Sequence, residues 1–390
     1  MTKNNHGTKW RDAVKAAHAR QDMRGERDAL EAFYEAASDH MEMAEYVRLA
    51  ETHYYLDNAP RALEILEIAD GRWPDEYNIL KGLAAANFQQ GRTGEALIWA
   101  EKAFALYPDS RELLSLLAMI HGQTGNRSKA REFGQKALIA KDKEVCGQTK
   151  VSGTLPPAKS FNPETPERNV IAFSLWGKDA RYLDGAITNA SLIPHLMPEW
   201  RGRFYCTRDL PEAAIETLVG HGADVILMPV EKNLWHGLFW RFYVANDPGI
   251  DRFLVRDVDG LISLKERASV LEWVAGDKLF HLMRDNYGHM DLLMAGLWGG
   301  TTGVLPPLRP QIDQFLDSRA DIKPNDQHFL EQYVWPVAKK SITIHDEHFG
   351  CFEALDFPDH PPRPLSGNIG TYGRDRARLP RGTVTSFSVS

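Results

Sequence analysis

The chain has 390 residues, of which 43% are hydrophobic and 25% are charged, and its formal net charge at pH 7 is −7. This length favours two domains, and this composition is typical of a soluble globular protein. The acidic balance excludes a global basic field that would attract nucleic acid or an anionic membrane. Any anionic substrate must therefore be met by cationic groups gathered locally.

The three cysteines, Cys146, Cys206 and Cys351, stand far apart and lack C-x-x-C spacing. They form neither a disulfide framework nor a zinc motif, and they fit a reducing compartment. The N-terminus lacks the apolar core of a signal peptide, and no stretch approaches 18 apolar residues. We therefore expect a cytoplasmic protein without a transmembrane segment.

The first third of the chain is rich in Ala, Leu and Glu and repeats itself every 34 residues. Asp57, Gly91 and Gly125 share one turn position of this repeat. A period of 34 with small residues where two helices meet is the tetratricopeptide pattern. The sequence predicts an all-α repeat domain over residues 1–145 that stacks as a short solenoid. The alanines that keep the period are Ala50, Ala84 and Ala118; Ala62, Ala96 and Ala130; and Ala69, Ala103 and Ala137.

A weaker repeat is expected from Ala13 to Asp39, with Gly25 at its turn and Ala29 in its second helix. Repeat arrays bind other proteins more often than they catalyse reactions. We therefore expect this domain to dock a protein partner or to self-associate, without chemistry of its own. Residues 146–168 lose the helical period and contain four prolines, which predicts a linker.

Residues 169–390 are predicted to form an α/β domain, because apolar runs alternate with segments of helical spacing. Such alternation indicates a mostly parallel sheet, whose ligands gather at the carboxyl ends of the strands. Ser174 and Trp176 leave the first strand, 169–177, at that edge. They are candidates for binding a nucleotide, and a strand exit without ligand contact explains them equally well.

Asp257 and Asp259 follow the apolar run 253–255, and Gly260 comes directly after them. In an extended chain residues two apart point the same way, so both carboxylates can face one point while Val258 faces the interior. Two such carboxylates repel unless a cation joins them, and Mg²⁺ or Mn²⁺ completes its coordination with phosphate oxygens and water. The pattern predicts a metal-dependent diphosphate site, against the alternative of a solvated turn or a helix cap.

The run W-R-F-Y-V that begins at Trp240, followed by F-L-V-R-D-V-D, resembles the DxD region of nucleotide-sugar-dependent glycosyltransferases of the GT-A fold. The span 169–372 resembles bacterial glycosyltransferase-like proteins linked to surface polysaccharide. These resemblances imply a GT-A-like domain that moves a sugar from a nucleotide-sugar donor to a hydroxyl of a saccharide or other acceptor, with Mn²⁺ or Mg²⁺ as cofactor. The alternative is a repeat scaffold whose glycosyltransferase-like domain binds a ligand without turnover.

The same resemblance implies roles for residues late in the chain. A third metal ligand, often histidine, maps onto His345 at the end of the alternating strand 341–346, with His348 and His360 as rivals; the alternative is a strand-end histidine that binds no metal. Asp326 and Gln327 map near the donor sugar, although helix capping alone also explains the aspartate.

Titratable side chains crowd between His281 and His289, which indicates a polar pocket. An inverting enzyme needs a carboxylate base at the acceptor hydroxyl, and Asp285 and Asp326 are both candidates. Trp298, in a glycine-rich segment read as a flexible turn, is expected to face a sugar ring. The further candidates for donor binding are Trp240, Arg241, Arg256, Arg284, His289 and Gly299.

Overall fold

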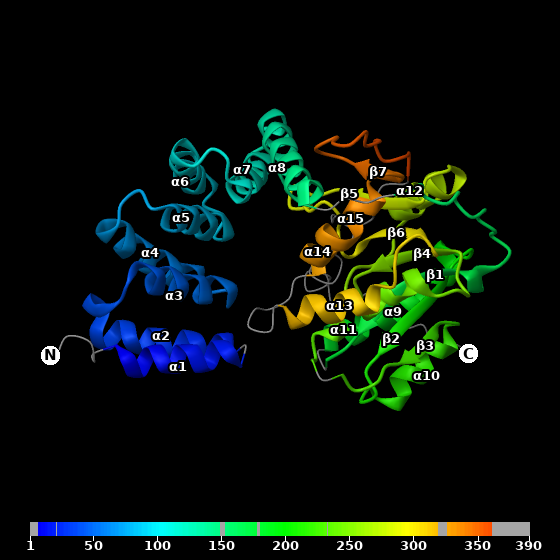
Figure 1. Ribbon diagram of the computed structural model, residues 1–390, viewed down its shortest axis with the longest axis horizontal. Coiled ribbons are helices and arrows are strands. Elements are labelled where there is room, and N and C mark those ends of the chain that lie inside the picture. The colour runs from blue at the N-terminus through cyan, green and yellow to red at the C-terminus, as the bar shows by residue number, and fades with distance from the viewer. Residues whose placement is uncertain are drawn as a thin grey trace, which may run out of the picture. The chain divides into compact units, whose positions relative to one another are not determined.

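The computed structural model describes residues 7–20, 22–148, 153–177, 180–231, 233–318 and 326–360 (Figure 1). The described residues up to Lys141 form one compact unit, and those from Asp142 form a second. None of the helices in these ranges is both long and apolar enough to cross a membrane.

The first unit is a tetratricopeptide-like stack of helix pairs, in which each helix packs beside the next (Figure 1). The predicted turn residues Asp57, Gly91 and Gly125 have φ values of 59°, 73° and 79°, the left-handed backbone that ends a helix. The nine alanines of the 34-residue repeat are at most 2% exposed, as close helix contacts require. The helices are α1 (Thr8–Ala19), α2 (Met23–Ala37), α3 (Met43–Tyr55), α4 (Ala59–Arg72), α5 (Tyr77–Gln89), α6 (Thr93–Leu106), α7 (Arg111–Gln123) and α8 (Arg127–Gln148), with a 3-10 turn η1 (Ser38–His40) after α2.

The weak first repeat is also a helix pair, α1 and α2, but Gly25 does not lie at its turn. Gly25 lies in the first turn of α2, where its N–H donates to the side chain of the N-cap residue Asp22 at 2.9 Å. A Cβ at Gly25 would lie 2.3 Å from that carboxylate, so the glycine makes room for the cap.

The second unit is built on a seven-stranded sheet of order β3-β2-β1-β4-β6-β5-β7. The strands are β1 (Asn169–Leu175), β2 (Arg201–Cys206), β3 (Asp224–Leu227), β4 (Arg252–Arg256), β5 (Phe280–Arg284), β6 (Leu297–Thr301) and β7 (Ile342–Asp346). The helical segments are α9 (Ala180–Leu196), α10 (Glu212–Gly220), α11 (His236–Phe239), α12 (Leu264–Ala275), α13 (Leu308–Asp317), α14 (Asp326–Phe329) and α15 (Trp335–Ala338), with η2 (Pro166–Arg168), η3 (Trp240–Asn246) and η4 (Leu330–Val334).

The sheet is mixed. The pairs β1–β2, β2–β3, β1–β4 and β5–β7 are parallel, whereas β6 runs antiparallel to both β4 and β5. The chain order reverses at β1, because β2 lies on one side of it and β4 on the other. In open α/β sheets ligands bind at the carboxyl ends of the strands beside such a switch point. The order therefore directs attention to the ends of β1 and β4.

The two faces of this sheet are covered by different elements. Ile171 and Phe173 of β1 pack in one core with α9 and with Trp273 of α12. On the opposite face Ser174 contacts η3, where Phe242 packs against Phe329 of α14 with ring centroids 6.1 Å apart. The alternation of β1 side chains thus separates a helix-covered apolar face from a face that carries η3 and α14.

The predicted linker packs against the second unit from Lys159 onward. The ammonium group of Lys159 donates to Thr302 Oγ1 at 2.9 Å, and Phe161 stacks on Trp200 with ring centroids 5.6 Å apart. The carbonyl of Lys159 accepts a 2.7 Å hydrogen bond from Arg252, a buried side chain whose pKa is lowered by burial to about 10. This part of the segment belongs to the core of the second unit.

We expect a fragment that starts at residue 169 to be less stable than one that starts at residue 153, by about 3 kcal/mol. The shorter fragment lacks the Lys159 carbonyl, which leaves the buried Arg252 guanidinium with the Lys278 carbonyl at 3.4 Å. Urea unfolding of both fragments measures the difference. Lys159→Ala in the longer fragment keeps the carbonyl and should cost less than the truncation, whereas equal stability of the two fragments would contradict the account.

Candidate functional site

The side chain of Arg241 joins two of the predicted acidic residues at the carboxyl edge of β1 and β4. Arg241 lies in η3 and is 4% exposed, and its guanidinium donates to Asp257 and, at 2.7 Å, to Asp326. It also donates at 3.1 Å to the carbonyl of Arg256, and its backbone N–H donates at 3.0 Å to the hydroxyl of Ser174. These bonds bring together β1, η3, the end of β4 and the start of α14.

Burial and mutual charge set the proton affinities in this cluster. Burial raises the pKa of Asp326, the positive Arg241 lowers it, and the net shift is upward. Burial lowers the pKa of Arg241, but Asp257 and Asp326 outweigh that effect and raise it. Arg241 therefore stays charged, and Asp326 is a carboxylate with an increased affinity for a proton.

Asp257 and Asp259 lie on a turn beyond the end of β4. The Gly260 N–H donates to the Asp257 carbonyl at 3.2 Å, so the chain reverses over these four residues. The prediction that strand alternation aligns the two carboxylates is wrong for this reason. The prediction that Val258 faces the interior is confirmed, because it is buried in the α9 core. The Asp257 side chain is 48% exposed and can meet a ligand.

Gly296 and Gln327 form the other side of the Asp257 environment. A Cβ at Gly296 would lie 2.0 Å from Asp257 Oδ2, so only glycine allows this backbone to pass the carboxylate. The adjacent Ala295 N–H donates to the Gln327 side chain at 2.8 Å. Gln327, predicted near the donor sugar, thus ties α14 to the segment that lies against Asp257.

Trp176, the predicted nucleotide-edge residue, leaves β1 and packs beside Trp235, with ring centroids 5.9 Å apart. A Cβ at Gly237 would lie 2.7 Å from the Trp176 ring, so α11 comes close to it. Both indoles are only partly buried. Trp240 is buried, and its indole N–H has no hydrogen-bond partner among the described residues.

His345 does not join Asp257 and Asp259. Its imidazole is hydrogen-bonded to His281 at 2.9 Å and to Glu272 at 3.0 Å. Among the described residues no group of three His, Cys, Asp or Glu side chains is arranged to hold a metal ion. His345 does not reach Asp257 and Asp259 because β6 and β5 lie between β7, which carries His345, and β4, which precedes the two aspartates.

The buried histidines are expected to make stability fall as the pH drops from 7 to 5. Burial lowers the pKa of His281 well below its usual value and lowers that of His345, so the folded chain takes up these protons at a lower pH than the unfolded chain. The unfolded chain takes up these protons below about pH 6.5, so stability is lost by up to about 1.4 kcal/mol per pH unit for each histidine. Melting temperatures from pH 5 to 8 measure this slope. His281→Phe, which keeps a ring against Trp273, should flatten it, and an unchanged slope would argue against the histidines.

Asp285 lies in a second polar cluster, at the carboxyl end of β5. Its buried carboxylate is 3.3 Å from the ammonium group of Lys265, which also binds Glu347. The N–H of Asp285 donates at 3.3 Å to His289. Since β5 and β4 both run antiparallel to β6, Asp285 and Asp257 share one sheet edge, roughly 10 Å apart at the spacing of two strands. Lys265 was not predicted, because nothing in α12 sets it apart from other helix lysines.

Two arginines predicted to bind the donor hold the fold together. Arg256 is buried in an ion pair with Glu266 of α12 and donates to the Trp298 carbonyl at 2.8 Å. Arg284 is fully buried and donates at 2.8 Å to the carbonyl of Leu292, which fixes the loop between β5 and β6. Both guanidinium groups are buried against protein partners, so they do not face solvent where a diphosphate could bind.

Trp298 and Gly299 lie in β6, between β4 and β5 in the sheet, where a flexible turn was predicted. Trp298 is fully buried and packs edge-on against Phe253 with ring centroids 5.2 Å apart, so it cannot stack on a sugar. A Cβ at Gly299 would lie 2.5 Å from the Phe253 carbonyl. The glycines serve the close pairing of β4 with β6.

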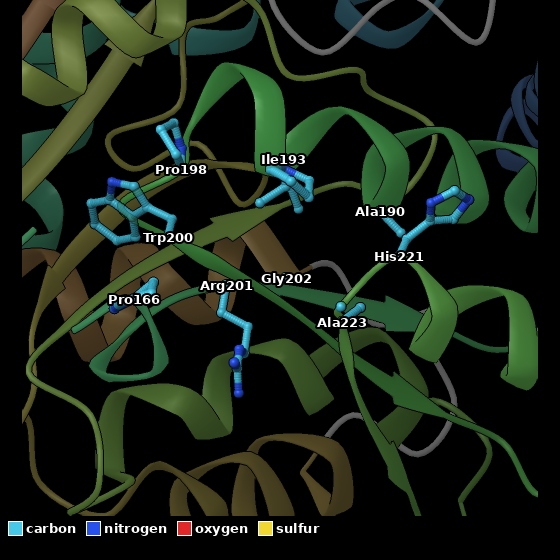
Figure 2. A pocket seen from close by; sticks show the side chains of 11 residues that line it. Pro166, Ala190, Ile193, Pro198, Trp200, Arg201, Gly202, His221 and Ala223 are labelled. Atoms are coloured by element: carbon cyan, nitrogen blue, oxygen red, sulfur yellow. The ribbon is translucent and has the colours of Figure 1, made fainter. Parts of the chain in front are cut away.

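A cavity of about 200 Å³ lies at the opposite edge, beside the amino end of β2 (Figure 2). Ile193, Trp200, Arg201 and His221 are among its lining residues. None of the lining residues is a carboxylate or one of the predicted site residues. The cavity is therefore separate from the cluster around Arg241.

Comparison with protein-family models finds no match, and comparison with curated proteins finds none. Among solved structures, MamA of Desulfovibrio magneticus RS-1 is 15% identical over 36% of this chain and 79% of its own, with a TM-score of 0.33. YrrB, a TPR protein with an unusual peptide-binding site, is 17% identical over 34% of this chain and 68% of its own, with a TM-score of 0.32. A mutant O-GlcNAc transferase of Thermobaculum terrenum is 16% identical over 59% of this chain and 42% of its own, with a TM-score of 0.39. Because these TM-scores are low, the roles of the site residues are inferred from the geometry of this chain alone.

Proposed function

We propose that the second unit is a metal-dependent glycosyltransferase that moves a sugar from a nucleotide-sugar to an acceptor hydroxyl, in surface polysaccharide or glycoconjugate synthesis. The observation that carries this proposal is the meeting of Asp257, Arg241 and Asp326 at the carboxyl edge of β1 and β4. That edge is where open α/β sheets bind ligands. The resemblance of the Asp257–Asp259 segment to the DxD region of GT-A enzymes supplies the reaction.

Asp257 and Asp259 are the residues that would hold Mn²⁺ or Mg²⁺, with diphosphate oxygens and water completing the coordination. A bound ion supplies Lewis-acid stabilisation of the negative charge that gathers on the leaving nucleoside diphosphate. Arg241 keeps the Asp257 carboxylate at the site through its hydrogen bond. Trp176, beside Trp235, offers an aromatic surface for the base of the nucleotide.

Asp326 is the better placed of the two candidate bases. It shares Arg241 with Asp257, whereas Asp285 is bound to Lys265 in the second cluster. Its raised pKa suits a group that must take a proton from the acceptor hydroxyl.

The repeat unit would supply a docking surface for a protein partner or for a second copy. Large apolar side chains stand exposed on it at Tyr55, Ile98 and Ile139.

A nucleoside diphosphate is expected to raise the melting temperature of the full chain only together with a divalent ion. A ligand that binds only the native state raises the free energy of unfolding by about 2.7 kcal/mol when its concentration is 100 times its Kd. UDP and GDP with Mn²⁺, and the same nucleotides with EDTA, are the arms of a thermal-shift experiment. An equal shift in EDTA would remove the metal from the proposal, and no shift with either nucleotide would count against donor binding.

A further inference from the structure

Asn189 of α9 is a fully buried polar residue that binds the loop carrying Asp257 and Asp259. Its Nδ2 donates to the carbonyl oxygens of Val258 at 3.1 Å and Gly260 at 2.9 Å. Its Oδ1 accepts from the N–H of Ile262 at 3.2 Å. All three hydrogen bonds of this side chain therefore go to the backbone of one loop.

The surroundings of Asn189 show that α9 is shaped around this loop. One turn earlier, a Cβ at Gly185 would lie 2.3 Å from the Val258 carbonyl and 3.2 Å from Asp259 Cα, so a glycine is needed for the approach. The helix face around Asn189 is otherwise small and apolar, with Ala186 and Ala190 in the core. A buried amide on such a face is unfavourable unless its hydrogen bonds are made.

The loop presents two carbonyl acceptors and one N–H donor to α9. Only a side-chain amide of this length supplies the two donors and the one acceptor that pair with them. Without Asn189 two carbonyls and one N–H would be left without these partners. The turn would keep the backbone bond from Gly260 to Asp257 that closes it and the bond of Arg241 to the Asp257 side chain. On a loosened turn the carboxylates of Asp257 and Asp259 would adopt more orientations. Binding of a metal–diphosphate complex would have to fix one of these orientations, and that loss of conformational freedom would weaken the affinity.

We propose that Asn189 is a positioning residue that acts through the backbone at Val258, Gly260 and Ile262 to orient Asp257 and Asp259 for a metal-bound diphosphate. The metal-binding part of this inference rests on the proposed function. The orientation of the turn does not, because it is visible in the chain without any ligand.

The chain offers a matched control in Asn169. This residue is also buried, and its Nδ2 donates to the carbonyl oxygens of Asn162 at 2.8 Å and Glu199 at 3.1 Å. It lies at the amino end of β1, at the opposite edge from Asp257. Asn169→Ala therefore removes a comparable buried amide without touching the turn.

Hydrogen exchange of the full-length protein tests the positional part. In Asn189→Ala the amides of residues 258–262 should exchange at least tenfold faster than in the unsubstituted chain, and in Asn169→Ala they should be unchanged. Asn189→Ser, which keeps one donor, provides a second variant should the alanine form fold poorly. Unchanged exchange at these amides in the Asn189 variants would overturn the inference whatever the protein binds.

Calorimetric titration with Mn²⁺ plus UDP and Mn²⁺ plus GDP tests the functional part. We expect Kd to rise at least tenfold in Asn189→Ala and less than twofold in Asn169→Ala, although both lower the melting temperature. Equal weakening in the two variants, or none in Asn189→Ala, would make Asn189 a structural residue only. If the unsubstituted chain binds neither nucleotide, the proposed function fails, and the exchange experiment still decides whether Asn189 holds the turn.

Discussion

Replacing Arg241 by methionine is expected to destabilise the second unit by about 3–5 kcal/mol, the range for breaking a buried ion pair from one side. Methionine keeps much of the side-chain volume but removes the cation that Asp326 and Asp257 share. Asp326 has only 13% of its side chain exposed, so its buried carboxylate would lose the cation that balances its charge. The variant should also lose nucleotide affinity, because Asp257 is no longer held.

Two further measurements test whether the unpaired Asp326 carboxylate causes the loss of stability. In Arg241→Met the penalty should shrink as the pH falls, because a protonated Asp326 no longer needs a cation. The double variant Arg241→Met/Asp326→Asn should recover most of the stability, since neither partner is then a buried unpaired charge, but should not recover binding. Urea unfolding at pH 5 and pH 8 separates these variants. A pH-independent penalty that the second substitution leaves unchanged would mean that Arg241 acts by packing alone.

Asp257→Asn is expected to lower metal-dependent turnover by two or more orders of magnitude, which corresponds to about 3 kcal/mol of transition-state stabilisation. Folding should survive, because the side chain is half exposed and an amide oxygen can still accept the hydrogen bond of Arg241. Asp259→Asn should act in the same direction. The readout is release of nucleoside diphosphate from a nucleotide-sugar with and without Mn²⁺.

His345→Phe provides the contrast for that experiment. The sequence predicted a third metal ligand here, so loss of His345 should have weakened Mn²⁺ binding. Because its imidazole is committed to His281 and Glu272, we expect the variant to change stability and leave the Mn²⁺ requirement unaltered. A turnover that His345→Phe abolishes and high Mn²⁺ restores would return His345 to the metal site.

The repeat unit could be predicted almost completely from the sequence, because its contacts are local and periodic. Asp57, Gly91 and Gly125 recur at one interval, and each adopts the left-handed backbone that their shared turn position requires. The exception is Gly25, where the first repeat is out of register. Its role depends on the Asp22 side chain of the same helix end, which the period alone does not reveal.

The α/β unit was predictable where a strand or helix could be recognised from its own pattern, and not where a role depends on strand order. Arg256 was predicted to bind the donor, yet it forms a buried ion pair with Glu266 of α12. Trp298 was read as exposed because glycines surround it, yet those glycines allow close strand pairing. His345 stands at the expected strand end, but that strand pairs with β5 rather than with β4.

The meeting of Arg241 with Asp326 shows the opposite case. Both were proposed from the resemblance to glycosyltransferases, on segments that lie 85 positions apart in the chain. Only the fold brings the Arg241 guanidinium within hydrogen-bonding distance of the Asp326 and Asp257 carboxylates. Asn189 was not predicted, because its role depends on the distant loop backbone that the fold brings to it.

Turnover of nucleotide-sugars by the full chain tests the central claim most directly. UDP- and GDP-linked sugars are incubated with Mn²⁺ or with EDTA, and released nucleoside diphosphate is measured for the unsubstituted chain and for Asp257→Asn. The account predicts release that requires Mn²⁺ and falls at least 100-fold in the variant, the two orders of magnitude expected from loss of a metal-ligand charge. Release that is equally fast in EDTA or in Asp257→Asn would contradict it.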